Sequence, residues 1–130
     1  AADVIDEGRK LDLADRYINT KTMKYLMRAG RIEEGNKAIA LFTRADVNDW
    51  AQDLFEMQNV HYEIECGNAH LEKFQYGRAL KKFHAIEKHF MDFIEEQFDF
   101  HNYCLRKMTL RSYVKLLKLV DRVRGHEVKY

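Results

Sequence analysis

Apolar residues recur every three or four positions along most of the chain, which is the period of an amphipathic α-helix. The longest pattern runs from Trp50 to Leu71 and predicts one continuous helical face there. Shorter patterns follow between Ala79 and Val123. No stretch alternates with period two between turn dipeptides, so an all-α protein is expected. The longest stripe consists of Trp50, Leu54, Met57, His61, Ile64, Asn68 and Leu71.

Interruptions of this pattern divide the chain into six expected helices. Their expected ranges are about 13–29, 31–43, 49–73, 77–93, 97–108 and 110–124. Because the connections are short, neighbouring helices are expected to pair as antiparallel hairpins. Asp12 followed by Asp15 resembles a capping box, which predicts that the first of these helices starts at Asp12.

The hairpins show signs of a repeat. Gly67, Ala79 and Phe83 follow the tetratricopeptide pattern, in which small residues let two helices approach and an aromatic ring fills the groove between them. Met23, Gly35 and Ile39 take the corresponding places in the preceding hairpin. The spacing exceeds the usual repeat of about 34 residues by roughly ten, and the extra residues are expected to extend the helix around Trp50 and the loop that precedes it.

The repeat divides the chain into a short tail and three hairpins. Residues 1–11 are expected to end a preceding helix, followed by hairpins over 12–48, 49–95 and 96–124. The expected architecture is a fragment of a right-handed tetratricopeptide-like superhelix. The start inside a repeat favours excision from a longer solenoid, whose uncovered ends favour self-association.

Composition narrows the class of protein further. The 130 residues carry a formal net charge of +1, divided as −4 over residues 1–65 and +5 over residues 66–130. This asymmetry favours an acidic partner for the second half. Two cysteines make no disulfide framework and suit a reducing cytosol. No apolar run approaches the roughly 18 residues of a membrane span, so no membrane partner is expected.

Sequence signatures of catalysis are absent. The chain contains no H-E-x-x-H, P-loop, G-x-G-x-x-G, G-x-S-x-G or C-x-x-C motif. None of the six histidines has a second histidine four residues away on one helix, so no metal site is expected. Cys104 lies near His101, but no third group that would orient such a pair can be identified. We therefore expect no enzymatic activity.

Two one-sided basic stripes are the sharper chemical signal. No acidic residue occurs between Arg16 and Ile32 or between Phe100 and Val120. Like charges one helical turn apart repel, so two interpretations stay open: a solvated face with long flexible side chains, or a surface for a polyanion, an acidic protein or RNA. The first stripe is Lys21, Lys24, Arg28 and Arg31, and the second is Lys107, Arg111, Lys115, Lys118 and Arg122.

Three blocks of sequence resemble a known family. L-D-L-A-D-R-Y-I-N-T-K-T-M-K-Y-L-M-R-A-G (11–30), G-R-A-L-K-K-F-H-A-I-E-K-H-F (77–90) and Q-F-D-F-H-N-Y-C-L-R-K-M-T-L-R-S-Y (97–113) are similar to the large auxiliary subunit of the N-terminal acetyltransferase A complex. The resemblance spans nearly all of residues 10–124. Full family members are far longer, which agrees with an internal fragment.

The resemblance implies a function and partners. The family's subunit is a non-catalytic tetratricopeptide superhelix in the cytoplasm that wraps a Gcn5-related catalytic subunit and attaches the complex to the ribosome. In several members inositol hexaphosphate bridges the two subunits, and no other cofactor is expected. The stretch from Gln75 to Ala79 is one residue short of an acetyl-CoA loop and should join two helices, so this fragment is not expected to bind acetyl-CoA.

The family's polyanion-binding positions map onto basic and aromatic residues of this chain. Two alternatives remain: a basic helical module that contacts ribosomal RNA, and an unrelated tetratricopeptide receptor that binds a short peptide and ignores polyphosphate. The matching positions are Arg16, Lys21, Lys24, Tyr25, Arg28, Lys81 and Lys82.

Overall fold

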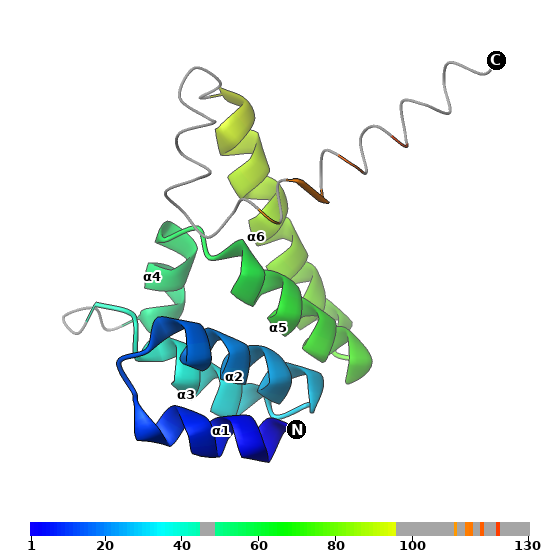
Figure 1. Cartoon of the computed structure of the whole chain (residues 1–130). Helices are drawn as coiled ribbons and strands as arrows, with labels where there is room; N and C mark the ends of the chain where they lie inside the picture. The colour runs from blue at the N-terminus through cyan, green and yellow to red at the C-terminus, as the bar shows by residue number, and fades with distance from the viewer. Residues whose placement is uncertain (45–48, 96–110, 112–113, 116–117, 119–121, 123–130) are drawn as a thin grey trace.

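The computed structural model of the protein describes residues 1–44 and 49–95, together with Arg111, Val114, Lys115, Lys118 and Arg122. Over the two continuous ranges every regular element is a helix, as the sequence predicts (Figure 1). The helices are α1 (Ala2–Leu11), α2 (Arg16–Arg28), α3 (Ile32–Ala40), α4 (Trp50–Glu56), α5 (Val60–Glu72) and α6 (Tyr76–Glu95). The expected helix 97–108 lies outside the described residues, and the five described positions of the expected helix 110–124 are helical.

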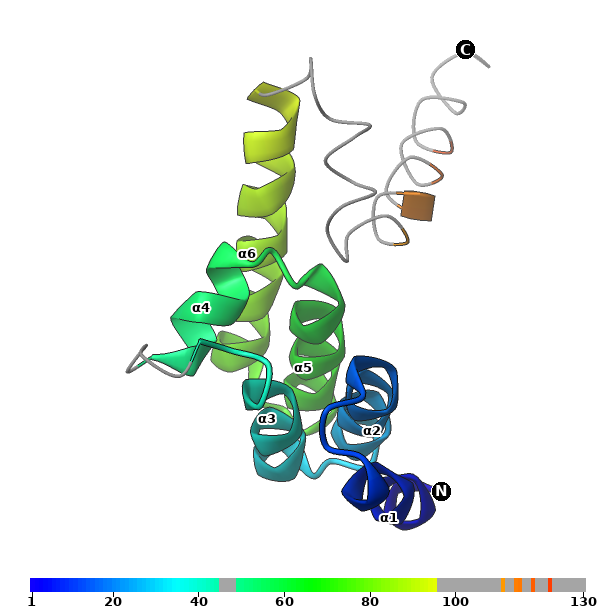
Figure 2. The same ribbon diagram turned by 60° about the vertical axis from the view of Figure 1, so that its left-hand side comes forward.

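Consecutive helices pack as hairpins, and the hairpins stack side by side. α1 packs on α2, α2 on α3 and α5 on α6, while α2 also packs against α5 (Figures 1 and 2). The buried core lies where α2, α3 and α5 meet. Its apolar members are Met23, Met27, Ile32, Ala38, Ile39, Leu54, Tyr62, Cys66 and Ala69.

The predicted tetratricopeptide contact is present between α5 and α6. A Cβ atom added at Gly67 would lie 2.7 Å from Cε1 of Phe83, closer than carbon atoms can approach. Ala79 is 2% exposed on the facing surface of α6. Glycine at position 67 therefore allows α6 to lie against α5 with the Phe83 ring in the groove, as expected for this motif.

In the earlier hairpin a glycine also allows two helices to approach closely, but it lies on the second helix of the pair. A Cβ atom added at Gly35 would lie 2.9 Å from Cε of Met27, so α3 also approaches α2 through a glycine. Gly30 has a φ of +74°, the left-handed conformation that lets the chain leave α2 and enter α3.

The single helix expected over 49–73 is wrong, because the chain breaks between α4 and α5. Gln58 adopts a φ of +53° after the end of α4. Asn59 then caps α5, with its Oδ1 accepting a hydrogen bond of 3.3 Å from the backbone N–H of Tyr62. The extra residues of this repeat therefore form a separate helix, and do not lengthen an existing one.

This break also shifts the apolar stripe that the sequence suggested. Asn68 is exposed and Leu71 is 45% exposed, although both belong to the expected buried face. The buried side of α5 instead carries Val60, Tyr62 and Cys66. Spacing was extrapolated across Gln58 as if the helix were continuous, and the left-handed residue changes the direction in which later side chains point.

The start of α2 corrects the expected cap. Asp15, and not Asp12, is the N-cap: its Oδ1 accepts hydrogen bonds from the backbone N–H groups of Tyr17 (2.7 Å) and Ile18 (3.2 Å). Asp12 instead accepts from the N–H of Ala14 at 2.9 Å and closes the preceding turn. Each carboxylate satisfies its own set of donors, so they do not form a capping box.

Two contacts hold helix α4, one in its middle and one near its C-terminal end. In the middle, Asp53 is 1% exposed and accepts hydrogen bonds from the backbone N–H (2.9 Å) and Nε (2.6 Å) of Arg44. The backbone hydrogen bond, helped by the guanidinium, holds the pKa of Asp53 below its ordinary value. Near the C-terminal end, the ring of Phe55 lies 4.4 Å from the ring of His89 in α6.

A buried carboxylate joins α5 to α6. Glu63 Oε1 lies 3.2 Å from Nε2 of His89, with both side chains at most 4% exposed. The second oxygen, Oε2, has no hydrogen-bond partner among the described residues. Sequence reasoning assigned no role to either residue.

Replacing Gly67 with valine is expected to lower the free energy of unfolding by about 2 kcal/mol, because the branched side chain would overlap the Phe83 ring. Gly8→Val in α1 is the control, since an added Cβ there meets no atom within 4 Å. Its expected change is below about 0.5 kcal/mol. Urea denaturation followed by circular dichroism measures both variants, and equal losses would contradict the close approach as the cause.

Candidate functional site: the cationic face of α2

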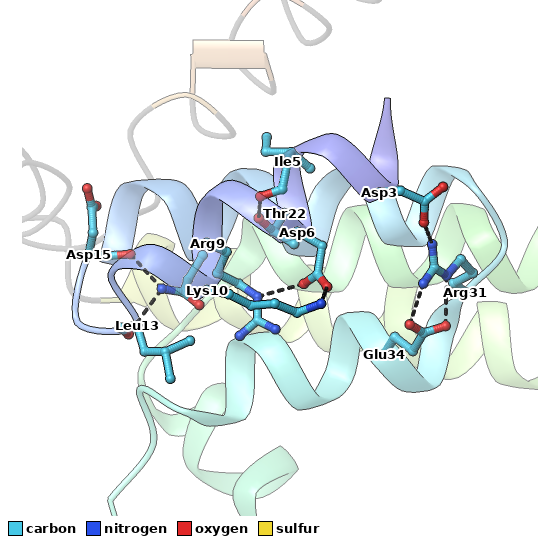
Figure 3. Close-up of polar contacts among 11 residues, drawn as sticks. Asp3, Ile5, Asp6, Arg9, Lys10, Leu13, Asp15, Thr22, Arg31 and Glu34 are labelled. Atoms are coloured by element: carbon cyan, nitrogen blue, oxygen red, sulfur yellow. Dashed lines mark hydrogen bonds and ion pairs between the residues drawn. The ribbon is translucent and has the colours of Figure 1, made fainter.

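The helix that carries the first basic stripe is held firmly at its N-terminal half. Asn19 Nδ2 donates hydrogen bonds to the carbonyl oxygens of Leu13 (3.1 Å) and Asp15 (2.7 Å). Thr22 Oγ1 donates to the carbonyl oxygen of Ile5 at 3.3 Å and so ties α1 to α2 (Figure 3). Asn19 and Thr22 are both fully buried, so the stripe projects from a fixed base.

The repulsion within the stripe is offset by an acid from another helix. Arg28 donates to both oxygens of Glu65, from Nε at 2.9 Å and from Nη2 at 3.0 Å, and Lys24 Nζ lies 3.9 Å from Oε1. The Glu65 side chain is 8% exposed, whereas that of Arg28 is 57% exposed. Hydrogen bonding to Glu65 raises the pKa of Arg28. Two stripe cations thus converge on one carboxylate of α5.

The last cation of the stripe belongs to a different cluster. Arg31 is the N-cap residue of α3 and forms ion pairs with Asp3 of α1 and with Glu34 of α3 (Figure 3). The hydrogen bonds that Arg31 donates to Glu34, and then to Asp3, raise the pKa of Arg31. Arg31 therefore links the α2–α3 turn to α1 and does not extend the surface around Glu65.

Three further predicted residues lie along α2. The Lys21 ammonium lies 5.4 Å from the ring centroid of Tyr17, and the Arg16 guanidinium lies 5.5 Å from that of Phe42. Tyr25 is 39% exposed. The charged groups of Arg16 and Lys21 thus lie over aromatic rings, which favours them by cation–π attraction.

The two predicted lysines of α6 have different surroundings. Lys81 is exposed, and Lys82 Nζ lies 4.7 Å above the ring of Tyr62. The Tyr62 hydroxyl in turn bonds Asn36 of α3 at 3.0 Å. Lys82 therefore contacts the side of α5 that faces α3, and this contact does not bring it to Lys24 or Arg28.

The second basic stripe approaches the first near His61. Arg111, Lys115, Lys118 and Arg122 are helical and exposed, while Lys107 lies outside the described residues. Burial lowers the pKa of His61, and the positive charges of Lys24, Lys115 and Arg111 lower it further, against the opposing effect of Glu65. Cations from two distant segments of the chain thus share one neighbourhood, which sequence spacing alone did not reveal.

The described residues present no catalytic constellation. They contain no group of three metal-ligating side chains and no helix that could span a membrane. Cys66 is buried, and burial raises the pKa of its thiol, which keeps it protonated. Cys104 and His101 lie outside the described residues. Gln75 and Gly77 lie at the junction of α5 and α6, so this stretch joins two helices as expected.

Spacing along the sequence did not identify Glu65 as the partner of the first basic stripe, although the sequence around Glu65 contains a signal for it. Glu63 and Glu65 both interrupt an otherwise apolar part of α5, and ionised side chains are rarely buried unless they are paired. A search for cations that could meet them would have pointed to α2.

Comparison with known proteins places the chain in a family. Residues 1–130 match the family described as N-terminal acetyltransferase A, auxiliary subunit. A mouse protein, N-alpha-acetyltransferase 16, NatA auxiliary subunit, is 48% identical over 126 residues, which are 97% of this chain and 14% of the mouse protein. The Arabidopsis thaliana N-terminal acetyltransferase A complex auxiliary subunit NAA15 is 48% identical over 123 residues, 95% of this chain and 14% of that protein.

A solved structure shows the same fold. The structure described as Naa15/Naa10 bound to HypK-THB matches with a TM-score of 0.72 and 38% sequence identity. The match covers 97% of this chain and 19% of the solved chain. The chain therefore spans a small part of the length of each of these relatives.

The variant Glu65→Gln is expected to be about 1 to 2 kcal/mol less stable, because Arg28 and Lys24 lose a buried counter-charge. The same change makes the α2 surface more positive, so its affinity for a polyanion should rise while stability falls. Glu7→Gln, at an exposed site on α1, is the matched control and should change neither. Denaturation and polyanion titration of the parent and the two variants test whether stability falls while polyanion affinity rises.

His61 gives the chain a defined response to acid. The folded-state pKa of His61 is lowered, so the unfolded chain binds the proton more tightly than the folded chain does. The free energy of unfolding is therefore fully present above about pH 6.5 and falls as the pH drops below that value. His61→Gln should lose less stability than the parent between pH 7.5 and 5.5. His84→Gln, at an exposed site on α6, should behave like the parent in the same denaturation series.

Proposed function

Because the chain belongs to the family of auxiliary subunits of N-terminal acetyltransferase A, we propose that it is a non-catalytic scaffold segment that holds the catalytic N-acetyltransferase subunit. The observation that supports this most is the stack of helical hairpins with a fixed cationic face. A rigid stack presents groups at constant spacing, and a partner that prefers this arrangement in one of its conformations is biased toward it.

The solved complex offers a model for the partner. Its description names Naa15 together with Naa10, and this chain matches one chain of that structure at 38% identity. By analogy, a protein of the Naa10 kind is the catalytic partner of the present chain. Its site of action in the cell would be the cytoplasm, at the ribosome.

The cationic face of α2 is the proposed binding site of inositol hexaphosphate. Arg16, Lys21 and Tyr25 are not engaged with Glu65, and Arg28 keeps more than half of its side chain exposed. Arg111 and Lys115 add positive charge near His61. Several phosphate groups on a compact ring would offset the mutual repulsion of these cations. Lys81 and Lys82 remain predicted contributors.

A second function is favoured by the described residues of the second stripe. Arg111, Lys115, Lys118 and Arg122 are all exposed on one helical face, which suits contact with the phosphates of ribosomal RNA. RNA bound in this way would show a steep dependence of affinity on salt and little preference for sequence.

Calorimetry with inositol hexaphosphate tests the polyanion proposal. Charge reversal at Lys24 or Arg28 would set a carboxylate against Glu65, so the cleaner variant is the double change R16E/K21E, which should weaken binding at least about tenfold. Lys88→Glu, an exposed change on α6, should bind like the parent. Equal binding by the R16E/K21E variant would contradict the α2 site, and failure of the catalytic subunit to co-purify with the chain would contradict the scaffold role.

A further inference from the structure

The face of α3 that points away from α2 carries its own stripe. Glu33, Asn36, Lys37 and Ala40 follow the spacing of one helical face, and none of them is buried. The opposite face carries the buried residues Ile32, Gly35, Ala38 and Ile39. This second face is not used by the cationic surface of α2.

From Glu33 to Ala40 the stripe lines an apolar cavity of about 440 Å³, which continues at one end to Leu41 and Trp50. This volume lies within the range of small-ligand and side-chain pockets, roughly 300 to 1,000 Å³. Its walls are Glu33, Asn36, Lys37, Ala40, Leu41 and Trp50. Leu41 is 51% exposed at its rim, so the apolar wall is open to a partner.

The other end of the stripe borders a cationic cavity of about 210 Å³ between the α2–α3 and α5–α6 turns. Lys73 and Arg78 line it, both exposed, and neither forms an ion pair with any residue in the described part of the chain. His70 also lines it and is fixed by a 2.8 Å contact with Gln75. Arg31 is present but already neutralised by Asp3 and Glu34.

The two cavities adjoin along α3, since Glu33 lines both of them, and together they are called the groove. Between the ends, the Tyr62 hydroxyl donates to Asn36 Oδ1 at 3.0 Å, and Lys82 covers the Tyr62 ring. The nine residues of α3 span about 13 Å, which equals roughly four residues of extended chain.

We propose that this groove binds a short extended segment of a partner protein that carries a carboxylate about four residues from a large apolar side chain. The carboxylate would lie between Lys73 and Arg78, and the apolar side chain would enter the cavity beside Trp50. Binding of this segment would be independent of the proposed scaffold function and of the α2 cations.

Charge favours a protein segment over a nucleic acid. Glu33 lines both cavities and forms no ion pair in the described part of the chain, so a strand with a phosphate on every nucleotide would meet its carboxylate. A peptide with a single carboxylate can place it between Lys73 and Arg78, away from Glu33. The apolar end suits an aliphatic side chain, which nucleotides lack.

Fluorescence anisotropy of a labelled peptide tests the groove in the whole 130-residue chain. The probe is the amidated peptide Glu-Ala-Ala-Ala-Leu, with analogues in which Lys replaces Glu or Ser replaces Leu. Each analogue should bind at least about tenfold more weakly. A reversed peptide with a free C-terminal carboxylate shows whether a terminal or a side-chain carboxylate is preferred. Trp50 is the single tryptophan, so its emission should shift only with peptides that carry Leu.

Variants locate the binding to the two ends. K73Q/R78Q should weaken the Glu-Ala-Ala-Ala-Leu peptide about tenfold, and Ala40→Arg, which fills the apolar end, should do the same. Lys88→Gln, an exposed change on α6 outside the groove, should bind like the parent, and circular dichroism checks the fold of each variant. Equal affinity for all peptides, an unchanged affinity in K73Q/R78Q, or tighter binding of a uridine oligonucleotide at the same residues would overturn the proposal.

Discussion

The burial of α5 between α2 and α6 is the constraint on which the described structure depends. A helix covered on two sides should be apolar, yet two of its carboxylates are buried. Glu65 is acceptable there because Arg28 and Lys24 reach it from one hairpin, and Glu63 because His89 reaches it from the other helix of its own hairpin. Each acid requires its neighbour to be in place, since a buried polar group without a hydrogen-bond partner is costly. The helices are thereby fixed in register as well as packed.

This arrangement changes the meaning of the one-sided basic stripe. Along the sequence the stripe has no counter-charge, whereas in space Glu65 lies beneath it. Part of the positive charge therefore stabilises the stack of hairpins. The remainder, on Arg16, Lys21 and the exposed edge of Arg28, is the part that a ligand can use.

Local patterns predicted the fold well wherever the helix was continuous. Gly67, Ala79 and Phe83 identified the α5–α6 contact because a glycine facing an aromatic ring is a local requirement of that packing. The prediction failed at Gln58, where one left-handed residue resets the helical phase and no glycine or proline marks the change. The site was harder to predict, because the pairing of α2 with Glu65 joins residues 37 positions apart and depends on tertiary packing.

The extra helix of the second hairpin has a consequence for how such repeats vary. Helix α4 lies on the flank of α6, where Phe55 contacts His89, the residue that also meets Glu63 of α5. An additional helix can thus be accommodated at the margin, where it lengthens the period of the solenoid without disturbing the Gly67 contact. Repeats built in this way can differ in size and still stack on a common axis.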